Sequence, residues 1–484
     1  MNVFSIVNFL IKYHMSIPVE FVLRYSGISK VSGRAQKIGA ELQSIRIYAK
    51  SKSNGYVYIK KEKKYNPSKK NICVTYAINN SLPETTNGYA TRTHYIASSV
   101  LKKDISIYPI TRVGYPVDIR KLNVSPSELL NYTIDNIEYS RLDRDGFRLR
   151  EVNAFDYMHN YADMLIEFSM QKKANIIHAA SDYYNGLAAI EAARNLNIPS
   201  IYEVRGFWEI TKASRYKGFR ESKIFSMMKE LEIQACHDAT SVIALSEVIK
   251  DELIERGINS DKIYIVDNGV DIEAMKPTDK DTALLKKLDW ENKFVVGFIG
   301  SVVDYEGLPL LIEAAKNIKQ SGNNNFRYLI VGDGNDLNNL KKLVKQNKLD
   351  DLFYFTGRVP FENVSKYYSI LDAACYPRKN WEVCSIVSPK KPFESMAYSI
   401  PVIASSVKAN SYFIEHNING LVHKFENIDS LAESLTTLEQ DTELRKRVGK
   451  NARDWVVMHR NSKMAGDLLK DIYIKTLEKY DKQH

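Results

Sequence analysis

Short runs of β-branched and other apolar residues alternate along the chain with longer stretches in which apolar residues recur every three or four positions. The short runs have the length and composition of buried strands, and the longer stretches have the periodicity of helices with one apolar face. Such alternation is typical of α/β domains built on parallel sheets. We expect one series of strands at residues 71–77, 175–181, 199–204, 239–246 and 262–269, and another at residues 294–301, 326–334, 352–357, 373–377 and 401–405.

The chain of 484 residues is too long for one hydrophobic core. Because a polar, proline-containing segment separates the two strand series, we expect two doubly wound, Rossmann-like domains that face a cleft. The first comprises residues 71–272 together with the final helix, residues 456–484, and the second comprises residues 273–455. Residues 1–70 form an N-terminal extension.

Composition and charge narrow the class of protein. The chain is 44% hydrophobic and 26% charged, which is typical of a folded soluble protein. Its net charge of +10 and pI near 9.0 favour contact with a nucleotide, a lipid phosphate or a membrane surface, and scattered lysines that keep the protein soluble are an equal alternative. The sequence has no aromatic-basic platform or recognition helix, which argues against nucleic-acid binding.

The apolar run at residues 3–11 is interrupted by Ser5 and Asn8, so it either docks on the protein or lies at a membrane interface.

The chain has four cysteines, Cys73, Cys236, Cys375 and Cys384, and no CxxC or ligand-like spacing among them. We expect reduced thiols in a cytoplasmic protein. Neither a disulfide framework nor a metal site is expected.

Candidate chemistry begins at the strand ends, because open parallel sheets bind ligands beyond the carboxyl ends of their strands. The stretch GFIGSVVDYEGL places Gly300 between a strand and a helix, where backbone amides and the positive helix end suit a pyrophosphate. VGDG, residues 331–334, repeats this arrangement one unit later. A glycine at a strand end is often only a turn residue, so each motif is weak alone.

The stretch KKPFESMAYSIPVIAS contains the start of another helix. Proline is favoured at the first position of a helix, which predicts that this helix begins near Pro392. Glu394 then lies in its first turn, with Lys391 just ahead. A first-turn glutamate stabilises any helix through the dipole, so a functional role depends on its surroundings.

Taken together, GSVVDYEGL, VGDG, TGRVP, SPKKPFESMA and PVIAS, in this order and spacing, resemble the nucleotide-sugar domain of the retaining GT-B glycosyltransferases of family four. Upstream, NSLPETTNGYATRT, ITRVGYPVD, IIHAASDYYNGLAAIEAARNLNIPSIYEVRGFWE and NGVD are similar to the acceptor domain of that family. The resemblance implies a GT-B fold and metal-independent transfer, with retained configuration, of a sugar from a nucleotide-diphosphate sugar. The expected donor is a UDP-sugar, the acceptor is a glycan or lipid-linked saccharide in polysaccharide biosynthesis, and no separate cofactor is required.

The resemblance assigns donor-binding roles in the second domain. Glu394 accepts hydrogen bonds from the two ribose hydroxyls, since two adjacent hydroxyls match the two carboxylate oxygens. Lys391 meets the diphosphate as a point charge, together with Gly300. The remaining positions are the amides of Ser395 and Met396 at the helix terminus, Arg358 and Val359 beside the base, and Arg378, which neutralises the diphosphate or supports its loop.

Three positions depart from the pattern of the family. Ser385 stands where relatives carry an acidic residue that touches the donor sugar, and Glu382, three residues earlier, is a candidate replacement. Ser301 and Glu306 stand where many relatives have an arginine and a lysine. These losses leave fewer cations for the leaving diphosphate, so a catalytically weakened subunit or scaffold of a glycan-assembly complex is the alternative function. An epimerase of the same architecture is a further rival.

In the acceptor half, His178 ends a predicted strand, and it either orients the acceptor or is a satisfied structural residue. Asn87 and Gly88 lie in the first glycine-containing loop, where the resemblance brings the backbone close to the donor phosphate. Arg205 and Arg92 pair either with phosphate or with a buried carboxylate such as Glu203. The basic N-terminal half is also a candidate for peripheral contact with the inner face of the cell membrane.

Overall fold

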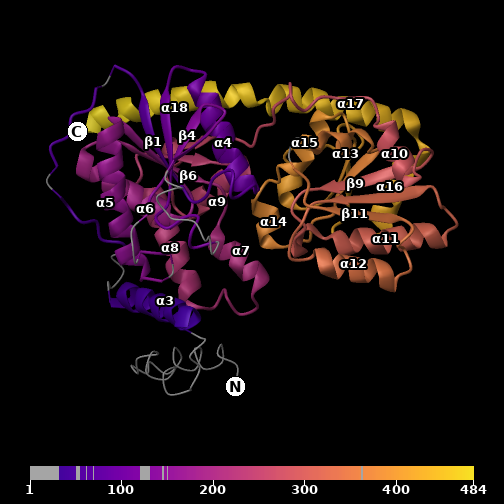
Figure 1. The fold of residues 1–484 in the computed structure, drawn as a ribbon, viewed down its shortest axis with the longest axis horizontal. Coiled ribbons are helices and arrows are strands. Elements are labelled where there is room, and N and C mark those ends of the chain that lie inside the picture. The colour runs from indigo at the N-terminus through magenta and orange to yellow at the C-terminus, as the bar shows by residue number, and fades with distance from the viewer. Residues whose placement is uncertain are drawn as a thin grey trace.

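The computed structural model describes residues 32–50, 55–61, 63–68, 70–119, 131–143, 147–149, 151–360 and 363–483. The chain forms two α/β domains that lie side by side, and the C-terminal helices α17 (Thr442–His459) and α18 (Ser462–Gln483) run along one edge of both (Figure 1). The apolar run at residues 3–11 lies outside the described residues. Among the helices within these ranges, none combines the length and the apolar character that a membrane span requires.

The sheet of the first domain has the strand order β3-β4-β2-β1-β5-β6-β7-β8, and all neighbours pair in parallel except β3 and β4. The helices α5, α6 and α8 cover one face, and α4 and α18 cover the other. The strands are β1 (Cys73–Ile78), β2 (Ser106–Thr111), β3 (Asn131–Ile134), β4 (Ile137–Arg141), β5 (Ile176–Ala180), β6 (Ser200–Val204), β7 (Ser241–Ala244) and β8 (Ile263–Ile265). The helices are α3 (Ser32–Lys50), α4 (Gly88–Leu101), α5 (Ala154–Lys172), α6 (Tyr183–Leu196), α7 (Trp208–Arg215), α8 (Lys223–Asp238), α9 (Glu247–Glu255) and α18 (Ser462–Gln483).

The second domain has a wholly parallel sheet with the order β11-β10-β9-β12-β13-β14. Its strands are β9 (Phe294–Ile299), β10 (Phe326–Val331), β11 (Phe353–Gly357), β12 (Ala373–Tyr376), β13 (Val402–Ser405) and β14 (Leu421–His423). Its helices are α10 (Thr282–Leu288), α11 (Leu308–Gln320), α12 (Leu337–Gln346), α13 (Ser365–Ser369), α14 (Glu382–Ile386), α15 (Lys391–Ala397), α16 (Ile428–Gln440) and α17 (Thr442–His459).

Every strand expected from the sequence is present, which confirms both series and the two parallel-sheet α/β domains. The strands β2, β3, β4 and β14 were not expected. Three of them give weak sequence signals, because β3 and β4 form a partly polar hairpin and β14 has only three residues. The strand β2 contains Pro109, which usually argues against a strand inside a sheet.

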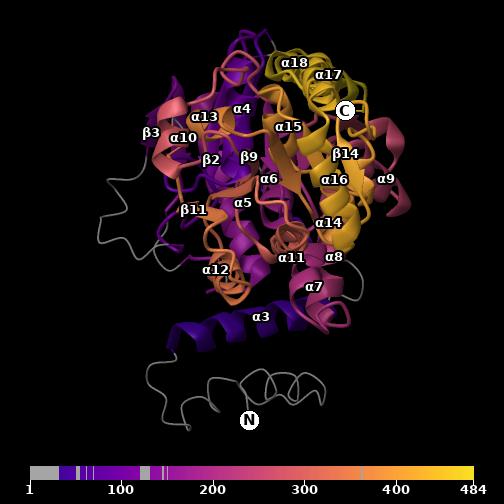
Figure 2. The ribbon, with the colours of Figure 1, turned by 90° about the vertical axis from the view of Figure 1, so that its right-hand side faces the viewer.

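The helix α14 belongs to the second domain but buries Val383, Cys384 and Ile386 in the core of the first. It packs against α7, as the view along the pair of domains also shows (Figure 2). The guanidinium of Arg215 lies 5.5 Å from the ring centre of Tyr305 across the same boundary. The two domains are therefore held together by apolar packing as well as by charge.

Glu232 on α8 gives the first domain a pH-sensitive element. Its carboxyl is buried and accepts a hydrogen bond of 2.6 Å from the hydroxyl of Tyr202. Burial, assisted by the charge of Glu209, raises the pKa of Glu232 to about 8. A folded-state pKa above that of the unfolded chain means that folding favours the protonated carboxyl, and this stabilising effect is lost as the pH rises through the folded pKa.

We therefore predict that Glu232→Gln stabilises the protein increasingly as the pH rises. The difference in unfolding free energy between the variant and the wild type should grow by roughly 2 kcal/mol from pH 6 to pH 9, because glutamine cannot ionise. Urea denaturation at several pH values measures this difference. The exposed Glu255→Gln serves as the control and should show no such trend; a flat difference for Glu232→Gln would contradict the buried, protonated state.

Candidate functional site

The carboxyl ends of β9 and β10 in the second domain bring the two glycine motifs together. Gly300 follows β9 with a φ of +145°, a conformation that favours glycine, and a Cβ there would overlap the side-chain stem of Lys391. Gly332 follows β10 with a φ of +135°, and a Cβ there would overlap the backbone of Gly300. Each motif was weak alone, but their contact and the crossing of Lys391 over Gly300 define one site.

Lys391 is the first residue of α15, and its ammonium lies 2.6 Å from Oε1 of Glu306. Glu306 is buried, and its Oε2 lies 3.9 Å from Nε of Arg378. Although burial acts in the opposite direction, the charges of Lys391 and then Arg378 lower the pKa of Glu306. The cluster of Lys391, Glu306 and Arg378 therefore holds two cations around one ionised carboxylate.

Arg378 supports its loop. One of its guanidinium nitrogens, Nη1, donates a hydrogen bond of 2.9 Å to the carbonyl of Val387, and the side chain is only 4% exposed. Of the two roles expected for it, loop support matches this position, and direct contact with a diphosphate does not. Lys391, with 19% of its side chain exposed, is the cation of the cluster that a ligand can reach.

Glu394 lies in the first turn of α15, as expected, with part of its carboxylate accessible. The hydroxyl of Tyr368 donates a hydrogen bond of 3.2 Å to its Oε2, and the ammonium of Lys390 lies 3.5 Å from its Oε1. The Tyr368 ring is buried and stacks on Tyr398 at 4.6 Å. Sequence reasoning missed Tyr368, and nothing in the stretch SKYYS distinguished it. One oxygen of Glu394 is thus oriented by a fixed hydroxyl.

The expectation for Ser395 and Met396 requires correction. Both residues lie beyond the first turn of α15, where helix amides bond within the helix, so their amides are not free at its terminus. Both side chains are buried, and the Ser395 hydroxyl is 2.7 Å from that of Tyr376. Their contribution is to anchor the helix that carries Lys391 and Glu394.

The remaining residues expected in the second domain lie at different depths. Ser301 and Arg358 are exposed directly after β9 and β11, and Val359 is half-buried against the domain core. Ser385 is half-buried on α14. The candidate replacement for the missing acid, Glu382, forms an ion pair with Arg220 of the first domain, which occupies its carboxylate.

In the first domain, Asn87 and Gly88 lie exposed at the start of α4. The Asn87 side chain caps this helix by accepting a hydrogen bond of 3.0 Å from the amide of Ala90. The loop therefore presents a capped helix terminus after β1, at the end of the sheet where parallel strands bind ligands.

His178 lies inside the first domain. Its ring is completely buried on β5, 3.0 Å from the Tyr473 hydroxyl on α18, and burial lowers its pKa to about 4. The imidazole is therefore neutral at pH 7. This position argues against contact with an acceptor or donor and favours the structural alternative that the sequence had left open.

Next to His178, Glu203 forms the centre of a buried ion cluster. Nε of Arg92 lies 2.7 Å from its Oε1, and Nη2 of Arg205 lies 2.8 Å from its Oε2. Burial opposes ionisation, but Arg205 and Arg92 outweigh it and lower the pKa of Glu203. The sequence had left open whether these arginines pair with phosphate or with a buried carboxylate. Both pair with a buried carboxylate. Arg92 also donates to the carbonyls of Val266 and Asp267, which ties α4 to the segment after β8.

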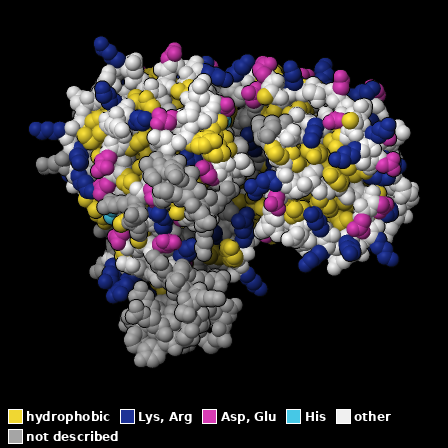
Figure 3. Space-filling view, in the orientation of Figure 1, with side chains coloured by type: hydrophobic (Ala, Val, Ile, Leu, Met, Phe, Trp, Pro, Cys, Tyr) yellow, Lys and Arg dark blue, Asp and Glu magenta, His cyan; other side chains and the backbone are white. Residues whose placement is uncertain are grey.

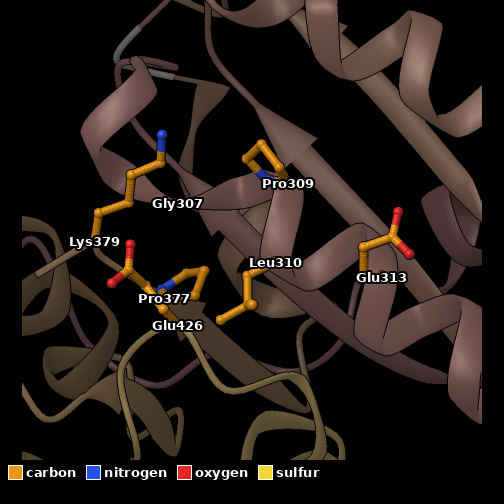
Figure 4. Close-up of a pocket in the computed structure, with 7 residues that line it drawn as sticks. All are labelled: Gly307, Pro309, Leu310, Glu313, Pro377, Lys379 and Glu426. Carbon is orange, nitrogen blue, oxygen red and sulfur yellow. The ribbon is translucent and has the colours of Figure 1, made fainter.

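Two surface depressions lie in the second domain. One, of about 260 Å³, is lined by Gly307, Pro309, Leu310, Glu313, Pro377, Lys379 and Glu426 (Figure 4). A second, of about 520 Å³, lies against α17 and includes Trp455 and Met458. Neither includes Lys391 or Glu394, so the candidate site is defined by its side-chain chemistry.

On the face shown in Figure 3, Lys and Arg side chains lie along the hollow between the domains. Within the described part of the chain, no three His, Cys, Asp or Glu side chains group closely enough to hold a metal ion.

Comparison with known proteins adds independent information. Residues 280–455 match the family model of glycosyl transferases group 1, and residues 125–274 match that of glycosyltransferase family 4. The chain is 28% identical, over 64% of its length and 78% of the relative, to the Escherichia coli UDP-Gal:α-D-GlcNAc-diphosphoundecaprenol α-1,3-galactosyltransferase. It is 27% identical, over 51% of its length and 55% of the relative, to a GDP-mannose-dependent α-mannosyltransferase of Corynebacterium glutamicum. The chain spans 55% to 85% of the length of eight curated relatives that it matches.

The fold is that of solved structures as well. The Anabaena protein HepE, crystallised in complex with UDP, superposes with a TM-score of 0.64 over 83% of this chain and 98% of its own. The two share 15% sequence identity, so this likeness concerns the fold.

We predict that Glu203→Gln destabilises the protein by about 3 kcal/mol or more, because it leaves two buried arginines without their counter-charge. Urea denaturation at pH 7 measures the loss. The matched control is Glu138→Gln, whose carboxylate is 42% exposed and pairs with Lys172 at 3.4 Å, and it should change the unfolding free energy by less than about 1 kcal/mol. Equal effects of the two substitutions would show that the buried cluster is not a stabilising centre.

Proposed function

Because the chain belongs to the group 1 glycosyltransferases of the GT-B fold, we propose that it transfers a sugar, with retained anomeric configuration, from a nucleotide-diphosphate sugar to a glycan or lipid-linked saccharide. The observation that carries this proposal is the convergence of Gly300, Lys391 and Glu394 at the strand ends of the second domain. A glycine turn without a side chain, a reachable cation and an accessible carboxylate match a diphosphate followed by a ribose.

We assign the donor contacts as follows. Glu394 accepts hydrogen bonds from the ribose hydroxyls, with Oε2 oriented by Tyr368. Lys391 binds the diphosphate beside Gly300, while Arg358 and Val359 flank the base. UDP is the proposed nucleotide, supported by the names of the galactosyltransferase relative and of the HepE complex. The mannosyltransferase relative is named for GDP-mannose, so GDP is the principal alternative.

In the proposed reaction, the bond between the anomeric carbon and the diphosphate breaks as the acceptor hydroxyl approaches the same face of the sugar. The departing phosphate oxygen takes the hydroxyl proton, and the sugar passes through an oxocarbenium-like state. Lys391 and the backbone near Gly300 and Gly88 stabilise the charge of the leaving group, which is catalysis by preorganised electrostatics. This route assigns no step to a metal ion or to a protein base.

The proposed location is the cytoplasm, with peripheral contact between the first domain and an anionic membrane surface. The segment between α7 and α8 supports this contact. Tyr216 is 61% exposed there and is flanked by the exposed side chains of Arg215, Lys217 and Lys223. Basic and aromatic side chains together suit a phosphate-rich interface.

We predict that calorimetric titration in the presence of a chelator detects micromolar binding of one donor from a panel of UDP-, GDP- and ADP-sugars. Glu394→Ala should weaken this binding at least tenfold, because the ribose hydroxyls lose a charged acceptor. The matched control is Glu443→Ala, whose carboxylate is 87% exposed on α17 and should leave affinity unchanged.

Three outcomes of this titration carry different meanings. Binding that requires a divalent cation would contradict the metal-independent route. Binding of every donor unaffected by Glu394→Ala would remove the assignment of the ribose site. An absence of binding to any donor would favour the scaffold alternative over the enzyme.

We also predict that the glycosidic bond formed keeps the anomeric configuration of the donor sugar, because acceptor attack and leaving-group departure share one face. Proton NMR of the product made with a panel of alkyl glycoside acceptors measures the configuration. An inverted product would exclude the mechanism given above, and epimerisation of the donor without any acceptor would identify the rival activity.

A further inference from the structure

Glu306 pairs with Lys391, the cation of the donor site that a ligand can reach. Its carboxylate is 2% exposed and ionised, and it takes the ammonium of Lys391 at 2.6 Å. Lys391 crosses Gly300 to reach it, so the cation assigned to the diphosphate is already paired.

Arg378 does not replace Lys391 at the ligand. Its guanidinium is buried, donates to the Val387 carbonyl, and faces Oε2 of Glu306 at 3.9 Å. Among the described residues neither Nε of Arg378 nor Oε2 of Glu306 has a hydrogen-bond partner. This second contact is therefore a pairing of charges without a hydrogen bond, and the Glu306 charge acts on both cations.

We propose that Glu306 is an internal counter-charge that competes with the diphosphate for Lys391, and that it weakens binding of the released nucleoside diphosphate more than binding of the nucleotide sugar. This inference rests on the proposed function and deepens it. Glu306 would act through Lys391 and would be a positioning residue that favours product release.

The difference in charge between the two ligands explains why Glu306 weakens binding of the nucleoside diphosphate more than binding of the nucleotide sugar. A nucleotide sugar carries its diphosphate as a diester, whereas the released nucleoside diphosphate ends in a monoester phosphate with an additional negative charge near pH 7.5. The negative charge of the Glu306 carboxylate repels each unit of ligand charge, so the ligand with more charge is repelled more. For an effective dielectric constant of about 20 and a separation of about 7 Å, one unit of charge changes affinity by roughly fiftyfold, and screening by salt reduces this to about tenfold.

The test compares two dissociation constants for each protein by calorimetry: that of a nucleoside diphosphate and that of its sugar. The probe pairs are UDP with UDP-glucose, GDP with GDP-mannose and ADP with ADP-glucose, and the pair bound by the wild type is used. In Glu306→Gln, the preference for the nucleoside diphosphate over its sugar should increase roughly tenfold. A role confined to supporting the fold would weaken both ligands alike and leave this preference unchanged, which would overturn the proposal.

Glu306→Gln leaves Arg378 buried without a counter-charge, so a second variant protects the test against unfolding. Glu306→Gln combined with Arg378→Met removes that stranded cation and frees Lys391 in the same way. It should show the same direction of change. The control is Glu313→Gln on α11, whose carboxylate is 38% exposed and should leave the preference at its wild-type value.

The two proposals fail differently. If the wild type binds neither a nucleoside diphosphate nor a nucleotide sugar, the proposed function fails and the competition has no ligand. If the wild type binds both and the folded variants keep the wild-type preference, the counter-charge proposal alone is wrong. An increased preference in the double variant supports the proposal even where the single variant is unstable.

Discussion

The crossing of the Lys391 side chain over Gly300 is the contact on which the candidate site depends. A side chain at Gly300 would occupy the space of the Lys391 stem, and a side chain at Gly332 would displace the backbone of Gly300. The close approach of β9, β10 and α15 at their ends therefore requires backbone without side chains. Because α15 also carries Glu394, this packing sets the cation and the carboxylate in one place.

Each domain contains a buried carboxylate that is paired with two cations, and the two clusters have different roles. In the first, Glu203 is enclosed between Arg92 and Arg205 and joins α4, β6 and the loop after β8. In the second, Glu306 is enclosed between Lys391 and Arg378. The first cluster is buried throughout and is structural, whereas in the second Lys391 reaches the surface. Exposure of one member is what separates a structural cluster from a candidate binding site.

Much of the fold was predictable, because the residues of central parallel strands are buried on both faces and form continuous apolar runs. Four strands were missed: β2 contains Pro109, and β3, β4 and β14 are short or partly polar. At the site, Lys391 and Glu394 were identified from the motif. Whether His178 is buried or faces the site could not be predicted from the sequence of its own strand. Whether a strand-end histidine faces a cleft or a covering helix depends on α18, which arrives from the far end of the chain.

The two parallel-sheet domains, the positions of their glycine turns and the carboxylate at the start of α15 could be predicted from the amino-acid sequence, since they follow from local periodicity and motif spacing. Which charges are paired could be read only from the folded chain. Glu306 and Lys391 are 85 positions apart, and Glu203 and Arg92 are 111 apart. Their pairing depends on how the chain folds back on itself, and burial then decides whether a charge stabilises the fold or remains accessible to a ligand.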